Sequence, residues 1–575
     1  YASGELTPGT VLADIRARAA MHVEHNIWIH LLSEVELEPY LLGLADKDPA
    51  TAKLWGIPFA IKDNIDLAGI PTTAGCEPFA YTPEQSSTVV QQLIDAGAIP
   101  VGKTNLDQFA TGLNGTRSPY GPCKNAFNPD YVSGGSSSGS AVSVALGLAS
   151  FSLGTDTAGS GRVPACFNNL VGVKPTCGLL SSTGMLPACK SIDSMTIFAY
   201  NVADAERTLS VAEGYDPTDA YSRVNPFKNS PRSFGKRVGD LTLGILPKDQ
   251  LKFFGDKAYA DAYEQTLATL GAAGVKFVEI DYAPFDEAAK LLYEGPWVAE
   301  RYLATQSLLE SNPDAMFPVV RAIIEPGDKP KATSLFSAQY RLRALKQLCD
   351  QQLASVDSLL TPTAGRCFTI AEMLEEPILR NSQLGYYTNF MNLLDMASIA
   401  IPTGYASNGL PFGVTLVGDK FEDRELLSIA SRFQPLFNLN AGASDIPQAL
   451  PDLTSVASSR SIDVVVCGAH LQGLPLNWQL TERGATLKAK THTAPVYRMY
   501  ALAGGPPFRP GLILDEAKGA KIEVEVWSVP TAEFGSFVNG IPSPLGIGKV
   551  CLLYTSPSPR DKIHDLVFRL LLEKT

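Results

Sequence analysis

A stretch of 32 residues, 133–164, combines nine serines and seven glycines with an apolar centre. A flexible linker has a similar composition, but a linker gains nothing from valine, leucine and phenylalanine in its middle. Between Ala141 and Leu153 the apolar residues first follow the spacing of a helix and then that of a strand. The stretch therefore predicts two Gly-rich loops held apart by a packed helix and strand, and a linker is the less favoured interpretation.

Each of the two loops is a candidate anion site, because glycine lets backbone N–H groups approach an anion closely. A phosphate-binding loop is the rival interpretation. It requires the motif G-x-x-x-x-G-K-[ST], and the stretch contains no lysine. The loops therefore favour a different kind of anion site.

The chain has six histidines, and none lies between residues 31 and 469. Histidine is the usual general base near neutral pH. Catalysis in this long part of the chain therefore needs another base. This disfavours Ser-His-Asp hydrolases and enzymes with histidine-bound metals.

The composition indicates a large globular enzyme. The 575 residues include 47 basic and 59 acidic side chains, and the net charge of −12 argues against a nucleic acid partner and a polybasic membrane anchor. Nine cysteines form no C-x-x-C pair, and no apolar run reaches the ~18 residues of a membrane span. We expect a cytoplasmic protein with no metal and no cofactor.

Helical and strand patterns alternate between residues 50 and 440, as in a helix over 87–96 followed by a strand at 99–102. This predicts an α/β fold with a mixed central sheet covered by helices on both faces. Prolines and serines at 446–459 predict a linker. We therefore expect one large domain at 1–445 and a small α+β domain at 460–550.

The end of the small domain is less regular. Alternating residues at 521–529 predict a strand with Val524 and Val526 on a buried face and Glu523 and Glu525 on an exposed one. Residues 551–575 form an atypical tail with a Pro-rich start and helical spacing afterwards. The tail is either an artefact of sequencing or a hinge followed by a helix.

Three segments together resemble the amidase signature family: GIPFAIKDNID with Lys62, the run at 134–139, and GTDTAGSGRVPA from Gly154. The 24-residue step from Ser136 to Ser160 also fits, as does VGVKPT at 171–176. Many members have Gly-Gly-Ser-Ile-Arg where this chain has AGSGR at 158–162, so the serine and arginine remain. The resemblance covers roughly residues 10–440 and implies the amidase-signature fold.

The same resemblance assigns a Ser-Ser-Lys triad. It implies that Ser160 is the nucleophile, that Ser136 relays the proton after a cis peptide bond, and that Lys62 is the base. Burial would be needed to lower the pKa of this lysine from ~10.4, so Asp63 and Asp66 are expected to point away from it. The resemblance also implies an oxyanion hole built from the backbone N–H groups of Thr157, Ala158, Gly159 and Ser160.

The segment LYEGPWVAERY at 292–302 resembles the allophanate hydrolases within that family. The resemblance implies that Tyr293 and Arg301 hold the substrate carboxylate, and Gly112 is a further candidate for the pocket. Eight residues separate Tyr293 from Arg301, which is about two helical turns, so one helix face could present both. A surface helix whose arginine pairs with a nearby acid is the alternative.

This resemblance implies hydrolysis of allophanate in urea degradation, giving ammonia and N-carboxycarbamate, which decarboxylates. It also implies a urea carboxylase as functional partner, separate or fused, and a homodimer. A transamidosome-type or broad-range amidase is the alternative of the same chemistry. An inactive scaffold is disfavoured because the three triad residues are intact.

The C-terminal part resembles the gamma-glutamyl cyclotransferase-like domain attached to allophanate hydrolases. Its matching segments lie at 464–480, 491–513 and 522–530. Two roles remain open: assembly of the protein, or action on the dicarboxylate intermediate. For the second role, His492 and Arg498 are the candidate residues.

Overall fold

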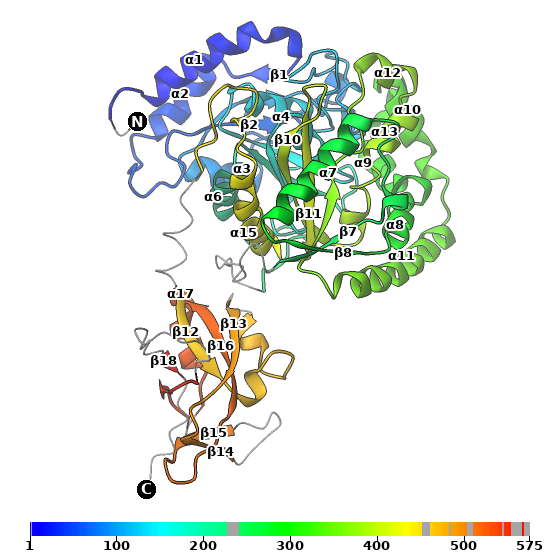
Figure 1. Cartoon of the computed structure of the whole chain (residues 1–575). Coiled ribbons are helices and arrows are strands. Elements are labelled where there is room, and N and C mark those ends of the chain that lie inside the picture. Colours follow the sequence, from blue (N-terminus) through cyan, green and yellow to red (C-terminus); the bar gives the residue numbers. More distant parts are fainter. Residues whose placement is uncertain are drawn as a thin grey trace. The chain divides into compact units, whose positions relative to one another are not determined.

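The computed structural model describes residues 1, 3–226, 241–450, 461–481, 483, 485–502, 510–542, 545–553 and 566–567. The chain divides into two compact units (Figure 1). The first contains the described residues up to Val224 and from 241 to Leu450, and the second contains those from Ser461 onward. Among these described residues, no helix is long and apolar enough to cross a membrane.

The first unit is built on an 11-stranded sheet with the strand order β1-β3-β2-β4-β6-β5-β10-β11-β9-β7-β8. Strand β2 runs parallel to β3 and β4, and β7 runs parallel to β8 and β9, whereas the other neighbours are antiparallel. The predicted mixed sheet is thereby confirmed. The strands are β1 (Trp28–Leu31), β2 (Pro58–Lys62), β3 (Ile99–Thr104), β4 (Phe151–Asp156), β5 (Val171–Lys174), β6 (Ser194–Ala199), β7 (Thr242–Ile245), β8 (Lys276–Glu279), β9 (Ser358–Pro362), β10 (Met396–Tyr405) and β11 (Pro411–Asp419).

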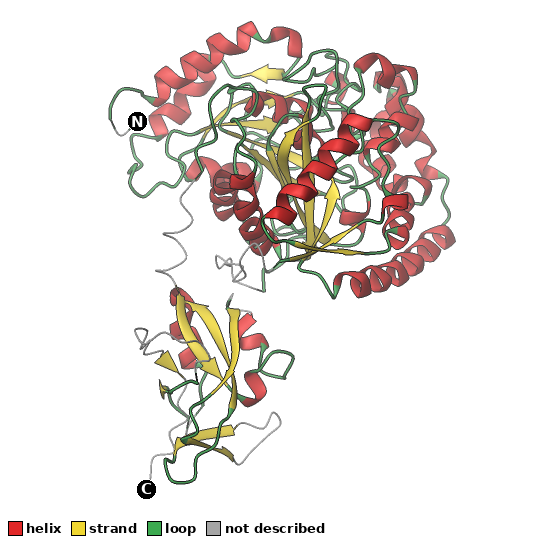
Figure 2. Ribbon diagram, viewed as in Figure 1, coloured by secondary structure: helices red, strands yellow, loops and turns green. Residues whose placement is uncertain are grey.

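Helices lie on both sides of this twisted sheet, as Figure 2 shows. Every residue of the central strands β2, β3 and β4 is buried, as expected for a sheet that is covered on both faces. The helices of the first unit are α1 (Pro8–Met21), α2 (Glu34–Gly43), α3 (Thr88–Asp95), α4 (Ser138–Ala145), α5 (Val163–Phe167), α6 (Val202–Ala212), α7 (Lys257–Ala272), α8 (Ala283–Glu294), α9 (Val298–Ser311), α10 (Pro318–Ile324), α11 (Ala332–Leu353), α12 (Ile370–Glu375), α13 (Leu379–Leu384), α14 (Phe390–Leu393) and α15 (Asp423–Phe433).

The helix and strand expected at 87–102 illustrate how the sequence sets the elements. Helix α3 begins after Ser87, whose hydroxyl accepts a hydrogen bond from the backbone N–H of Val90. The helix ends before Gly97, which has a φ of +96°. A Cβ at Gly97 would lie 2.8 Å from the Cα of Trp55, so only glycine fits here. Strand β3 follows directly.

The Ser/Gly stretch contains the packed helix and strand that its apolar centre predicts. All residues of α4 are buried, and so are all residues of β4. The two Gly-rich loops therefore flank buried elements, at the N-terminal end of α4 and at the C-terminal end of β4. A linker is excluded.

The second unit consists of small sheets and short helices. A three-stranded sheet has the order β12-β16-β13, β14 pairs with β15, and β17 pairs with β18. The elements are β12 (Ser461–Val466), α16 (Trp478–Thr481), β13 (Thr486–His492), β14 (Tyr497–Ala501), β15 (Pro510–Leu514), β16 (Glu523–Pro530), α17 (Thr531–Asn539), β17 (Gly548–Lys549) and β18 (Leu566–Val567).

Two expectations for this unit were wrong in detail. Strand β16 is not half-exposed, because Glu525 is buried and accepts hydrogen bonds from the indole N–H of Trp527 and the backbone N–H of Gln472. These donors offset the cost of burying the carboxylate. In the tail, Leu566 and Val567 form the strand β18 rather than a helix. The other tail residues from 554 onward, and 451–459 of the expected linker, lie outside the described residues.

Candidate active site

Lys62 is the last residue of β2 and is completely buried. Its Nζ lies 2.8 Å from Ser136 Oγ and 2.7 Å from Thr155 Oγ1. Ser136 belongs to the loop before α4, and Thr155 belongs to β4, which pairs with β2. The parallel pairing of β2 and β4 therefore brings the lysine to both hydroxyls. Thr155 was not among the residues predicted from the sequence.

Burial lowers the pKa of Lys62 from 10.5 to about 7, because the charged ammonium loses its hydration. The carboxylates of Asp107, Asp193 and Asp156 act in the opposite direction but do not cancel the effect of burial. A substantial fraction of Lys62 is therefore neutral near pH 7 and able to accept a proton.

The two aspartates that follow Lys62 in sequence are engaged elsewhere, as expected. Asp63 accepts a hydrogen bond from the backbone N–H of Thr73 and pairs with Lys103 at 3.0 Å. Asp66 accepts hydrogen bonds from the hydroxyls of Thr72 and Tyr81. Neither is among the main groups acting on the pKa of Lys62.

The Gly135–Ser136 peptide bond is cis, as the family resemblance implies. Asp107 supports this loop, since its backbone N–H donates to the carbonyl of Ser136 at 3.1 Å. A Cβ on Gly135 would lie 2.2 Å from Asp107 Oδ2, and one on Gly112 would lie 2.4 Å from the same atom. Asp107 thus packs against both glycines, which explains why neither position has room for a side chain.

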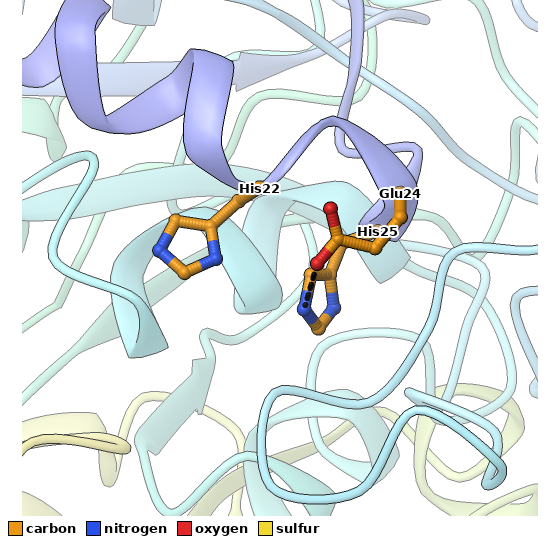
Figure 3. Close-up of side chains that lie close together, drawn as sticks. All are labelled: His22, Glu24 and His25. Carbon is orange, nitrogen blue, oxygen red and sulfur yellow. Dashed lines mark ion pairs between the residues drawn. The ribbon is translucent and has the colours of Figure 1, made fainter.

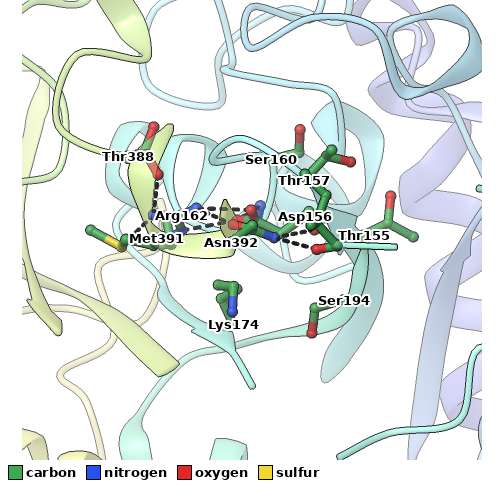
Figure 4. Close-up of polar contacts among 12 residues, drawn as sticks. Thr155, Asp156, Thr157, Ser160, Arg162, Lys174, Ser194, Thr388, Met391 and Asn392 are labelled. Carbon is green, nitrogen blue, oxygen red and sulfur yellow. Dashed lines mark hydrogen bonds and ion pairs between the residues drawn. The ribbon is translucent and has the colours of Figure 1, made fainter. Parts of the chain in front are cut away.

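Ser160 lies in the second Gly-rich loop, and its hydroxyl is 3.4 Å from the carbonyl oxygen of Gly112. A buried ion pair closes this loop below the serine: Arg162 contacts Asp156 at 2.8 Å, with both side chains fully buried. Asn392 donates a hydrogen bond to the carbonyl of Asp156 at 2.8 Å. In Figure 4 the side chain of Ser160 points away from this network, which therefore supports the loop and leaves the hydroxyl available.

The backbone of residues 157–160 presents hydrogen-bond donors. No acceptor among the described residues pairs with the N–H groups of Thr157, Ala158, Gly159 or Ser160. Buried N–H groups are almost always paired in native proteins, so four adjacent exceptions indicate a place for an anion. Thr157 also donates its hydroxyl to Asp193 at 2.5 Å. Burial raises the pKa of Asp193 to about 6.

Arg301 and Tyr293 are neighbours, but they lie on two helices rather than on one helix face. Tyr293 is in α8 and Arg301 in α9, and the break between them falls at Gly295. The guanidinium of Arg301 donates to the Tyr293 hydroxyl at 3.3 Å, to Thr111 Oγ1 at 2.9 Å and to the carbonyl of Ala110 at 3.2 Å.

Arg301 is buried, and its hydrogen-bond partners are neutral. Within the part of the chain that the structure describes, no carboxylate lies within 4 Å of its guanidinium. The alternative of a surface arginine paired with a nearby acid is therefore wrong. Segment 110–112 contacts Arg301 through residues 110 and 111 and Ser160 through Gly112. A buried arginine without a directly paired carboxylate is suited to bind an anionic group in this position.

The structure gives His492 and Arg498 different surroundings. His492 ends β13 and is exposed, whereas Arg498 in β14 pairs with Asp515 at 3.4 Å. No contact between them is found among the described residues. Their pairing in one site remains a prediction.

Comparisons with known proteins agree with this geometry. Residues 22–427 match the amidase family, and residues 462–556 match the allophanate hydrolase C-terminal domain. The chain belongs to the amidase family. It is similar in particular to Kluyveromyces lactis allophanate hydrolase, with 39% identity and a TM-score of 0.76, over 99% of this chain and 94% of that one.

Two further relatives define the extent of the likeness. Urea amidolyase of Saccharomyces cerevisiae is 45% identical over 540 residues, which are 91% of this chain but 29% of that protein. The chain thus spans less than a third of this relative's length. One component of the glutamyl-tRNA(Gln) amidotransferase of Acidobacterium capsulatum is 33% identical over 68% of this chain and 88% of that one.

Proposed function

We propose that the chain hydrolyses the amide of allophanate (urea-1-carboxylate) with Ser160, Ser136 and Lys62 as its catalytic residues. The observation that carries the proposal is a buried lysine with a pKa of about 7, hydrogen-bonded to one serine, in a site that also holds a buried arginine with neutral partners. The lysine supplies the base, and the arginine supplies the counter-charge for the substrate carboxylate.

In the acylation step Ser160 Oγ attacks the terminal amide carbon and its proton passes to Ser136 Oγ. The proton of Ser136 passes to neutral Lys62 Nζ, 2.8 Å away. The resulting ammonium returns a proton through the same relay to the leaving amide nitrogen, which departs as ammonia. Water then enters, gives its proton to the relay, and releases N-carboxycarbamate from Ser160. This product loses carbon dioxide to form carbamate, which breaks down to ammonia and a second carbon dioxide.

The negative charge that develops on the carbonyl oxygen would be stabilised by the backbone N–H groups of Thr157, Ala158, Gly159 and Ser160. One such donor typically contributes about 3–4 kcal/mol to the transition state. The support is that these N–H groups have no acceptor among the described residues. Gly159, with a φ of +151°, has no space for a Cβ, which would lie 2.4 Å from Thr388 Oγ1.

The carboxylate of allophanate would bind to Arg301 and Tyr293, with Gly112 lining the pocket between them and Ser160. Planar guanidinium is well matched to a carboxylate, because it offers two parallel N–H donors. This explains why an amide that carries a carboxylate should be preferred to a simple amide.

For the second unit we propose a role either in assembly or in processing the dicarboxylate product through His492 and Arg498. We also propose urea carboxylase as the functional partner. The support is the match to under a third of a urea amidolyase, which leaves length for a step that makes allophanate from urea. A homodimer and a cytoplasmic location are proposed from the family resemblance.

The test is ammonia release from allophanate by the purified full chain. Wild type should release ammonia, and Ser160→Ala and Lys62→Ala should abolish release while the far-UV circular dichroism is retained. Ser143→Ala is the matched control, since this buried serine lies in α4 and donates to the carbonyl of Ser140. Full activity of either triad variant would refute the assignment. Ammonia and carbon dioxide yields of His492→Ala and Arg498→Ala test the role of the second unit.

A further inference from the structure

His22, Glu24 and His25 form a cluster on the turn that follows α1, away from the residues assigned to catalysis. One candidate ligand atom from each side chain lies within 4.8 Å of the other two. Figure 3 shows the three side chains projecting from one short turn, with Glu24 beside the ring of His25. His25 is buried, His22 is half-buried and Glu24 is exposed.

The ring of His25 is oriented by the neighbouring segment. Its Nδ1 lies 3.3 Å from the carbonyl oxygen of Lys124. A carbonyl can only accept a hydrogen bond, so Nδ1 carries the proton and Nε2 of the neutral ring has a free lone pair. Nε2 is the nitrogen that faces Glu24, 3.6 Å from Oε1. Histidine ligands of metals are typically held in this way, with the other ring nitrogen donating to a carbonyl.

The backbone also favours a cation here. His22 is the C-cap residue of α1, and the C-terminal end of a helix carries partial negative charge. The positive charge of Lys124, which also acts on His25, opposes a cation. The separation of 3.6 Å between His25 and Glu24 exceeds a hydrogen bond but is close to the distance between two ligands of one tetrahedral zinc ion, roughly 3.3–3.5 Å for bonds of about 2.0–2.1 Å.

We propose that His22, Glu24 and His25 bind a divalent transition-metal cation of the zinc type. Two imidazoles and one carboxylate suit zinc better than magnesium or calcium, which prefer oxygen ligands. The half-buried His22 and exposed Glu24 can change rotamer to close the remaining distance around the fixed His25. This proposal departs from the expectation, drawn from the sequence, that the chain holds no metal.

The cation would act as a structural clip rather than as a catalyst. The backbone N–H of Lys124 donates to the carbonyl of His25, so the turn and the segment before the first Gly-rich loop are already joined. In that segment the carbonyl of Cys123 accepts a hydrogen bond from the hydroxyl of Ser133 at 2.7 Å. Zinc on His25 would therefore stabilise the base of the loop that carries Ser136.

The test uses the untagged full chain after dialysis against a chelator. Titration calorimetry with zinc chloride should show one site, and both His22→Ala and Glu24→Gln should weaken it at least ten-fold. His30→Ala is the matched control, because His30 pairs with Glu36 instead, at 2.9 Å. Zinc should also raise the Tm of wild type and of His30→Ala, but not that of His22→Ala.

Cobalt chloride provides a second readout that does not depend on stability, since its visible spectrum reports ligation by nitrogen and oxygen. The proposal is overturned if zinc does not bind, or if binding is unchanged in both His22→Ala and Glu24→Gln. It is also overturned if binding is lost in Cys551→Ser, which removes an exposed thiol in the second unit.

Discussion

Replacing Lys62 by methionine should remove activity and at the same time change how stability depends on pH. Lys62 has a pKa of about 7 in the folded chain, against 10.5 for an ordinary lysine. Between these values the unfolded chain binds more protons than the folded chain, so the stability of wild type rises with pH in this window. Below about pH 7 the full cost of burying the lysine is present, and above about pH 10.5 it is gone.

The size of this effect follows from the two pKa values. Wild type carries a penalty of roughly 4 kcal/mol at pH 7 and roughly 2 kcal/mol at pH 9, a change of about 1.4 kcal/mol per pH unit at most. Methionine carries no such penalty, but it leaves the hydroxyls of Ser136 and Thr155 without the lysine, at a pH-independent cost of about 1–3 kcal/mol. Lys62→Met should therefore be about 1–3 kcal/mol more stable than wild type at pH 7, and lose about 2 kcal/mol of that advantage by pH 9.

The assay is guanidinium chloride unfolding of wild type and Lys62→Met at pH 7, 8 and 9, followed by tryptophan fluorescence. Ser160→Ala serves as the control, because it removes a catalytic hydroxyl without removing a titratable group. Its difference from wild type should stay constant with pH. A difference between wild type and Lys62→Met that is also constant from pH 7 to pH 9 would refute the low pKa of Lys62, and with it the role of this residue as the base.

Three further predictions follow from contacts in the site. Arg301→Gln should lower kcat/KM for allophanate by about 10²-fold or more while leaving simple amides much less affected, because a buried counter-charge for a carboxylate is lost; equal losses for both substrates in steady-state assays would contradict this role. Gly135→Ala should lower stability by about 1–3 kcal/mol or more and abolish activity, because its Cβ would lie 2.2 Å from Asp107 Oδ2; denaturation and ammonia release measure both, and an unaltered variant would show that the loop relaxes freely. Asp156→Asn should cost about 3–5 kcal/mol by leaving Arg162 buried without its partner, whereas Asp261→Asn, in an exposed pair with Lys257, should have little effect on Tm.

Local patterns were sufficient to predict the packed centre of the Ser/Gly stretch and the mixed sheet. They were sufficient because apolar spacing determines which residues can be buried together, and α4 and β4 are buried over their whole length. Glu525 shows where such patterns fail. Its charge predicted an exposed face, but N–H donors from Trp527 and the distant Gln472 satisfy the carboxylate inside the protein.

In the site, the residues predicted from the family resemblance surround Lys62 and Ser160, but their supporting residues could not be predicted. Asp107 and Asp193 act on Lys62 from segments far from it in sequence, and no local motif marks them. Thr155 stands within GTDTAGS and could have been considered, because its position one residue before Asp156 places it on the buried strand β4. Tyr293 and Arg301 were predicted on one helix because the spacing ignores the break at Gly295.

Segment 110–112 has a consequence for the choice of substrate. Its first two residues bond to Arg301, and the carbonyl of its third residue faces the hydroxyl of Ser160. The span between the reacting carbonyl and the carboxylate is therefore measured by three residues of one continuous backbone. Engineering this enzyme toward longer amides with a terminal carboxylate would have to begin with an insertion in this segment, and widening the pocket elsewhere would leave the length of the preferred substrate unchanged.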